Sequence, residues 1–157
     1  MNRLLPSLLC LVIAVSAPLW AAETSDSNLQ ILLDKVHADK KLLVAANMEL
    51  NDAQGKAFWP VYDDYQKELQ VINKRLIAVI GSYADAWNTD TVTDDKAKSL
   101  LDEALAIEEA QVALRKKYVD KLTGVLPAML VARFVQIENK IRAAVNFELA
   151  EEIPLVE

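Results

Sequence analysis

The stretch Leu50–Gln66 reads LNDAQGKAFWPVYDDYQ, and it marks the start of a long helix. Asn51 can accept a hydrogen bond from the first free amides of that helix, and Gln54 can reach back to the amide of Asn51, so the two residues predict a capping box. From Phe58 onward, apolar residues recur about every 3.5 positions, a spacing typical of helices that pack along their length. We therefore expect a helix that starts after Asn51 and runs to about Trp87. Its apolar stripe is Phe58, Tyr62, Tyr65, Leu69, Ile72, Leu76, Val79 and Tyr83.

Two more helices are expected, one before and one after this long helix, and the polar turn Asn88–Asp94 separates the long helix from the later one. One precedes Leu50 and covers about Asn28–Asn47, with an apolar stripe that Lys40 interrupts. The other covers about Asp94–Thr123, where Thr93 or Thr91 supplies the cap and Gly124 ends the helix. The apolar stripe of the first is Leu29, Leu32, Leu33, Val36, Leu43 and Val44, and that of the other is Leu100, Ala104, Ile107, Gln111, Leu114, Tyr118 and Leu122.

A last helix is expected to open with Pro127 as its first residue and to stop before Pro154. Its apolar face is Leu130, Phe134, Ile137, Ile141, Val145 and Leu149. The chain has only three glycines and abundant helix-forming residues, which favours an all-α fold. We predict four helices, with a long antiparallel helical hairpin at the centre and the first and last helices packed over its open end.

The N-terminus is typical of an exported protein. A short basic start is followed by the apolar run Leu4–Trp20 and by Ala21 and Ala22, a pattern that predicts a secretory signal peptide. We assign residues 1–21 to a cleaved signal peptide and residues 22–157 to one helical domain in the periplasm. An earlier cut and a retained membrane anchor are the alternatives.

Composition narrows the classes of function. The only cysteine is Cys10, inside the expected signal peptide, so the domain that follows has no disulfide framework and no thiol nucleophile. The formal net charge is −6, and no basic cluster indicates a nucleic-acid partner.

The segment Leu50-Asn51-Asp52-Ala53-Gln54 resembles the LTxxQ motif of the Spy/CpxP family of periplasmic proteins, with Leu50, Asn51 and Gln54 at the motif positions and asparagine in place of threonine. The second motif of that family would open the last helix. There the chain reads Val125-Leu126-Pro127-Ala128-Met129 and keeps only the proline and the helix that follows.

The resemblance implies a non-enzymatic role on a Spy/CpxP-like fold. Spy-like members are ATP-independent chaperones, CpxP-like members restrain a sensor kinase, and relatives in metal-resistance systems bind zinc, nickel or cobalt. The family usually forms a curved dimer of helical hairpins. The implied partners are unfolded or partly folded proteins, an envelope-stress sensor, and a second copy of the chain.

Four aromatic residues follow the cap, and three of them are candidates for a client-binding surface: Phe58, Trp59 and Tyr62. Aromatic side chains supply a large contact area at low entropic cost. The alternative is that Phe58, Tyr62 and Tyr65 belong to the core because they lie on the stripe. Trp59 lies beside the stripe, which makes it the sharper candidate.

Pro60 falls inside the expected helix, where it removes one backbone hydrogen bond. It predicts a bend that would curve the hairpin. The alternative is a boundary between a short first helix and the main one.

We expect no metal site, no cofactor and no catalytic residue. His37 is the only histidine, and a transition-metal site needs more nitrogen or sulfur ligands than it supplies. Adjacent carboxylates such as Asp63 and Asp64 point apart on a helix and do not converge as an acid/base pair.

The leading hypothesis is a periplasmic binding protein, an ATP-independent chaperone or envelope-stress accessory protein that holds unfolded polypeptides. The alternatives are a periplasmic partner of a stress-sensing or metal-sensing system, and a structural or membrane-associated helical protein.

Overall fold

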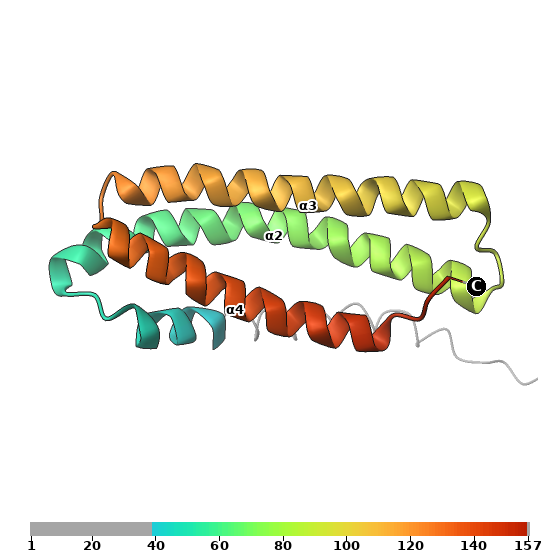
Figure 1. The fold of residues 1–157 in the computed structure, drawn as a ribbon, viewed down its shortest axis with the longest axis horizontal. Helices are drawn as coiled ribbons and strands as arrows, with labels where there is room; N and C mark the ends of the chain where they lie inside the picture. The colour runs from blue at the N-terminus through green and yellow to red at the C-terminus, as the bar shows by residue number, and fades with distance from the viewer. Residues whose placement is uncertain (1–38, 157) are drawn as a thin grey trace, which may run out of the picture. The chain divides into compact units, whose positions relative to one another are not determined.

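The computed structural model describes residues 39–156, and every regular element among them is a helix. Residues 39–48 are helical, and α2 (Asp52–Asn88), α3 (Asp94–Thr123) and α4 (Ala128–Glu152) follow (Figure 1). The prediction of an all-α chain with four helices is confirmed. The expected signal peptide, the first part of the first helix and His37 lie outside the described residues. Residues 40–157 form one compact unit. Among the described helices, none is long and apolar enough to cross a membrane.

α2 begins where the sequence predicts. The side-chain oxygen of Asn51 accepts from the Gln54 amide at 2.9 Å, and the Gln54 side chain accepts from the Asn51 amide at 3.0 Å. This capping box satisfies two of the amides that a helix start leaves free. α2 continues through Pro60 without a break, so the alternative of a helix boundary there is wrong. The bend at Pro60 stays a prediction.

α2 and α3 run antiparallel, as the order of their polar contacts shows. Glu68 on α2 pairs with Lys117 at 2.7 Å, Arg75 pairs with Glu103 at 2.8 Å, and Ser82 accepts from Lys96 at 2.6 Å. Residue numbers rise along α2 as they fall along α3, and the two helices lie side by side in Figure 1.

The turn between α2 and α3 is built on local hydrogen bonds. The amide of Thr91 donates to the carbonyl of Ala86 at 2.9 Å, and the amide of Asp90 donates to that of Trp87 at 3.2 Å. Asp90 adopts a left-handed backbone with φ 53°. This is the Schellman arrangement, with aspartate at the position that glycine usually occupies. Thr93, one of the two predicted caps, then accepts from the Lys96 amide and starts α3.

The α3–α4 connection agrees with the sequence prediction at one residue and differs at another. Gly124 ends α3 as its C-cap, with a right-handed φ of −73°. Pro127 is the N-cap of α4 and not its first residue, because its ψ of 142° is extended. The connection is short, and it places the start of α4 beside the end of α3 (Figure 1).

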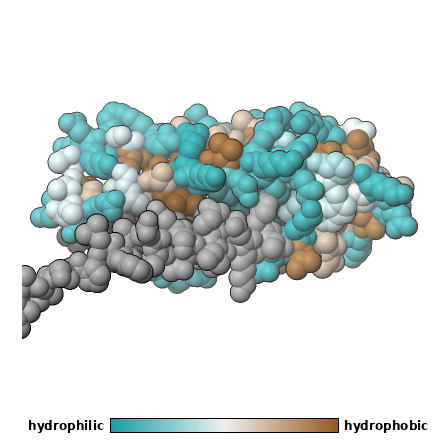
Figure 2. Space-filling view, turned by 180° about the vertical axis from the view of Figure 1, so that it is seen from behind, coloured by the Kyte–Doolittle hydropathy of each residue, from teal (hydrophilic) through white to brown (hydrophobic). Residues whose placement is uncertain are grey.

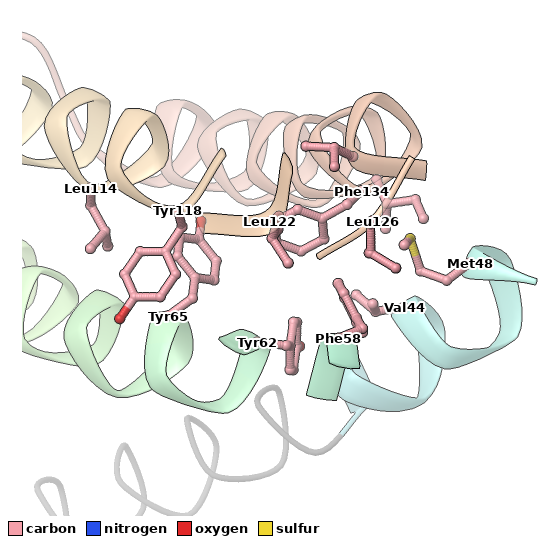
Figure 3. Close-up of a cluster of buried hydrophobic side chains, with 12 residues drawn as sticks. Val44, Met48, Phe58, Tyr62, Tyr65, Leu114, Tyr118, Leu122, Leu126 and Phe134 are labelled. Carbon is pink, nitrogen blue, oxygen red and sulfur yellow. The ribbon is translucent and has the colours of Figure 1, made fainter. Parts of the chain in front are cut away.

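The core is concentrated at the end of the hairpin where α2 starts and α3 finishes (Figure 3). Residues 40–48 contribute Val44 and Met48, and α4 contributes Phe134 among others. The buried cluster comprises Val44, Met48, Phe58, Tyr62, Tyr65, Leu114, Tyr118, Leu122, Leu126, Val131, Phe134 and Ile137. Residues 40–48 and α4 therefore cover this end.

Burial falls off away from that end. Leu76, Val79 and Tyr83 belong to the predicted stripe of α2 but are only half-buried. The predicted core assignments of Leu43 and Val145 are wrong, because both side chains are exposed. α4 diverges from α3 toward its C-terminal end (Figure 1), so the last turns of its apolar face lack a closely packed helix on that side.

Candidate functional site

Two of the three predicted client-binding residues are buried. Phe58 is 0% exposed and Tyr62 is 1% exposed. Their rings pack against Phe134 of α4 in edge-on contacts, with centroids 5.5 Å and 6.1 Å apart. The prediction that Phe58 and Tyr62 form part of an exposed patch is therefore wrong. The alternative, that Phe58, Tyr62 and Tyr65 belong to the core, is confirmed. The physical reason is that both lie on the stripe that faces α4.

Trp59 lies at the border of this core and is half-buried. Its ring contacts Phe58 and Tyr62 edge-on, with centroids 5.0 Å and 5.4 Å away. The ammonium of Lys41 lies 5.4 Å from the ring centroid. Trp59 also borders a hollow of about 430 Å³, whose other lining residues are Ala45, Leu50, Asn51, Asp52, Gly55 and Lys56. A Cβ built at Gly55 would lie 3.7 Å from the indole nitrogen, in ordinary van der Waals contact with the ring.

A buried polar cluster joins three helices next to the aromatic core. Glu138 of α4 is buried, and its carboxylate accepts from Lys40 at 2.8 Å and from the Tyr65 hydroxyl at 3.1 Å. Gln66 completes the cluster, donating to Glu138 and accepting from Lys40, each at 3.4 Å. A buried carboxylate is tolerated when it is paired and hydrogen-bonded. The cluster therefore fastens residues 40–48 to both α2 and α4.

Tyr62 and Tyr65 differ in how their hydroxyls are satisfied. The Tyr65 hydroxyl donates to Glu138, whereas the buried Tyr62 hydroxyl has no hydrogen-bond partner among the described residues. Burial raises the pKa of both phenols well above their usual range, and the negative charge of Glu138 raises them further. Both side chains therefore stay neutral, and Tyr62 carries an unpaired polar group in the core.

This polar cluster was not predicted from the sequence, where Lys40 interrupts an apolar stripe and neither Gln66 nor Glu138 stands out. A signal was present, because Glu138 lies on α4 between the stripe residues Phe134 and Ile141, and Lys40 lies within the stripe of the first helix. Opposite charges on two apolar faces indicate a buried pair, since either alone would be costly there.

A second polar cluster links α2 and α3 at the border of the core. Glu68 accepts from Lys117 and from the Tyr118 hydroxyl, each at 2.7 Å, and Lys121 lies 4.4 Å above the Tyr118 ring. The hydrogen bonds from Lys117 and then Tyr118 lower the pKa of Glu68. Burial, followed by the hydrogen bond to Glu68, raises the pKa of Tyr118 to about 12. Glu68 and Lys117 flank a groove of about 440 Å³ lined also by Val71, Ile72, Ala110, Ala113 and Leu114.

Exposed apolar side chains follow a line on α3. Leu101, Leu105 and Val112 are 58%, 50% and 41% exposed. They are four and seven residues apart, so they share one face of the helix, separate from the face that carries Ile107 and Leu114 into the core. On the face of the molecule in Figure 2, apolar patches lie between hydrophilic side chains.

Within residues 39–156, no group of three or more His, Cys, Asp or Glu side chains is placed so that it could bind a metal ion. His37 lies outside that range. Comparison with family models, with curated proteins and with solved structures gives no match.

Proposed function

We propose that this chain is a non-enzymatic binding protein of the periplasm, an ATP-independent chaperone or envelope-stress accessory protein that holds unfolded polypeptides. Its antiparallel pair of long helices is proposed to be a Spy/CpxP-like hairpin. The capping box at Asn51 and Gln54, where the sequence resembles the LTxxQ motif, is consistent with that proposal.

The observation that carries the proposal is the apolar line on α3. Leu101, Leu105 and Val112 place methyl-rich surface in solvent along about three turns of helix, outside the buried core. Single exposed apolar residues are ordinary, but a line of them on one helix face is typical of a surface that contacts another chain. An unfolded polypeptide offers apolar side chains in any order, so it requires such a surface rather than a shaped pocket.

Charged side chains surround the apolar residues and limit how tightly a client is held. Lys98 and Asp102 form an ion pair on α3, in the same turns as Leu101. On α2, Val71 is 63% exposed and lines the groove that Glu68 and Lys117 flank. A client that contacts this surface buries a modest apolar area next to groups that remain hydrated. Binding that is weak and reversible follows, as expected of a chaperone that uses no ATP.

Aggregation of a reduced model client tests the proposal. The purified protein at substoichiometric amounts should slow the growth of light scattering. The variant Leu101→Gln/Leu105→Gln should lose most of that protection while its helix content and melting temperature stay unchanged, since both side chains are exposed.

The matched control is Met129→Gln/Leu155→Gln, which removes two exposed apolar side chains from elsewhere in the chain. It should protect as well as the wild type. Equal losses of client protection in the two double variants would assign binding to general surface hydrophobicity. A wild-type protein that leaves the client aggregating at its unassisted rate would contradict the chaperone proposal. In that case the sensor partner becomes the proposal to test.

Trp59 is proposed as a second contact, through the ring edge that borders the hollow. Trp59→Ala should lower client protection without changing the size of the protein on gel filtration. A change of size together with protection would instead assign Trp59 to an interface between copies.

A further inference from the structure

Residues 40–48 are held to the rest of the described chain along a single face. Val44 and Met48, four positions apart, are both fully buried. In Figure 3, Val44 points toward Phe58 and Met48 lies beside Leu126. The side chains of Leu42 and Leu43, before Val44, and the three between Val44 and Met48 are exposed. This segment is therefore a cover that contacts the core through two apolar side chains and the lysines at its start.

The surface beneath the cover is aromatic and acidic. Lys40 pairs with Glu138 and lies 5.9 Å above the Tyr65 ring. Lys41 pairs with Asp63 at 2.5 Å and lies within 6.0 Å of the Tyr62 ring centroid. Two basic residues and two apolar residues of the cover thus meet two carboxylates and an aromatic layer.

α2 does not need the cover in order to start. Its first turn is closed by its own residues, through the capping box of Asn51 and Gln54. Between the cover and this cap, Glu49 adopts a left-handed backbone with φ 52°, which is unfavourable for a residue with a Cβ. Its carboxylate accepts from Arg133 of α4 at 2.7 Å, in an exposed ion pair of the kind that contributes little to stability. The strained residue Glu49 thus lies close to a helix start that closes itself, so separation of the cover would not require α2 to unfold.

We propose that residues 40–48 are a displaceable cover over a second client-binding surface, formed by Phe58, Tyr62 and Tyr65 with Asp63 and Glu138, and that this surface takes a basic amphipathic helix of a client in place of the cover. This inference rests on the proposed function and adds to it the class of client and the surface that binds that client.

The chemistry of the client follows from the cover itself. The pattern is two adjacent basic residues with apolar residues at the fourth and eighth positions after the first, as in Lys40, Lys41, Val44 and Met48. A helix with this pattern can repeat both ion pairs and fill the same apolar positions. A client helix with acidic residues at the start would face Asp63 and Glu138 and would be rejected by charge.

Thiol labelling tests whether the cover opens by itself. The variants are Val44→Cys on the cover and Val131→Cys on α4, each in a Cys10→Ser background. Both valines are buried to the same degree, 0% and 2% exposed, and the substitutions are identical in size. Under native conditions Val44→Cys should react with a thiol reagent at least about tenfold faster than Val131→Cys, because local opening is more frequent than global unfolding. Equal rates would overturn the proposal.

Breaking the ion pair between Lys40 and Glu138 gives a second test of whether the cover opens. Lys40→Met leaves the Glu138 carboxylate buried without its cation, so labelling of Val44→Cys should be faster than in the protein that keeps Lys40. Adding Glu138→Met to Lys40→Met removes the unpaired charge and should restore the slower rate. A Lys40→Met variant in which the labelling rate of Val44→Cys does not change would also overturn the proposal.

A fluorescent peptide with the sequence KKLLVAANMEL, identical to residues 40–50, tests the client chemistry. Fluorescence anisotropy should report binding that is tighter to the Lys40→Met protein than to the wild type. A peptide carrying glutamate at both lysine positions should bind neither protein. Equal binding of the two peptides, or none, would overturn the assignment of the site. These measurements need no aggregating client, so they stay interpretable if the aggregation assay fails.

Discussion

The ammonium of Lys40 lies 2.8 Å from the carboxylate of Glu138, across 98 residues of sequence and within a nearly dry environment. Breaking such a pair from one side leaves a buried charge unpaired, which costs about 3–5 kcal/mol in comparable cases. We expect Lys40→Met to lower the free energy of unfolding by an amount near the bottom of that range, because Tyr65 and Gln66 still hydrogen-bond to Glu138. Urea unfolding followed by circular dichroism measures the loss.

The double variant Lys40→Met/Glu138→Met is the control for this prediction. It should recover most of the stability, since apolar residues of similar length can replace a buried ion pair at little cost. A double variant less stable than Lys40→Met alone would show that Glu138 stabilises the fold through groups other than Lys40.

The hydroxyls of Tyr62 and Tyr65 give a matched pair of substitutions with opposite expected effects. Tyr62→Phe removes a buried hydroxyl that has no partner among the described residues, so it should be neutral or should raise the free energy of unfolding by about 1 kcal/mol. Tyr65→Phe removes a hydrogen bond to a carboxylate and should lower it by about 1.5–3 kcal/mol. Chemical denaturation of the two variants measures both changes in the free energy of unfolding. Equal losses of stability would contradict the assigned hydrogen bonds.

Alkaline pH should destabilise the fold through its buried tyrosines. The folded state raises the pKa of Tyr118 from 10.0 to about 12, and it raises those of Tyr62 and Tyr65 in the same direction. A raised pKa means that the folded state holds the proton more tightly than the unfolded state. The stability that these phenols contribute is therefore fully present below pH 10 and is lost as the pH rises toward 12.

Urea midpoints measured between neutral pH and pH 12 test this prediction, and Tyr118→Phe is the variant that checks its cause. The loss of stability above pH 10 should be shallower in Tyr118→Phe than in the wild type. Parallel curves for the two proteins would assign the alkaline transition to other groups.

Local signals in the sequence predicted the helix boundaries well. The caps at Asn51 and Thr93 depend on residues three positions apart, so a short stretch contains all the required information. Periodicity likewise predicted the buried faces of Phe58 and Tyr62. It failed for Val145, because a period identifies a face but not whether a neighbouring helix reaches it.

The polar cluster could not be deduced in the same way. Lys40, Gln66 and Glu138 come together only when three helices meet, and the angle at which α4 crosses α2 decides whether they do. Each residue alone resembles a surface charge or amide. Only the position of Glu138 within an apolar face, matched with the position of Lys40, indicated that the two would pair.

The left-handed backbone of Asp90 offers a way to strengthen the turn between α2 and α3. The hydrogen bonds from Asp90 and Thr91 to the end of α2 form the motif that glycine usually completes. Asp90→Gly removes the Cβ strain and a negative charge at the negative end of the helix, and should raise the free energy of unfolding by about 0.5–1 kcal/mol. Thermal melts compared with Asp90→Asn, which keeps a Cβ and removes the charge, separate the two causes.

Pro60 lies nine residues into α2 with its side chain exposed, so its replacement tests stability and shape together. Pro60→Ala restores an amide that can donate to the carbonyl of Lys56 and removes the clash of the ring with that carbonyl. The free energy of unfolding should rise, by up to about 3 kcal/mol if the helix straightens fully. If the bend shapes the client-binding surface, protection of an aggregating client should fall as stability rises. Unfolding and aggregation measured on the same preparation make the comparison, and Ala57→Ser, a small change one turn earlier on α2, serves as the control. A gain in both properties would mean that the proline bend has no part in binding.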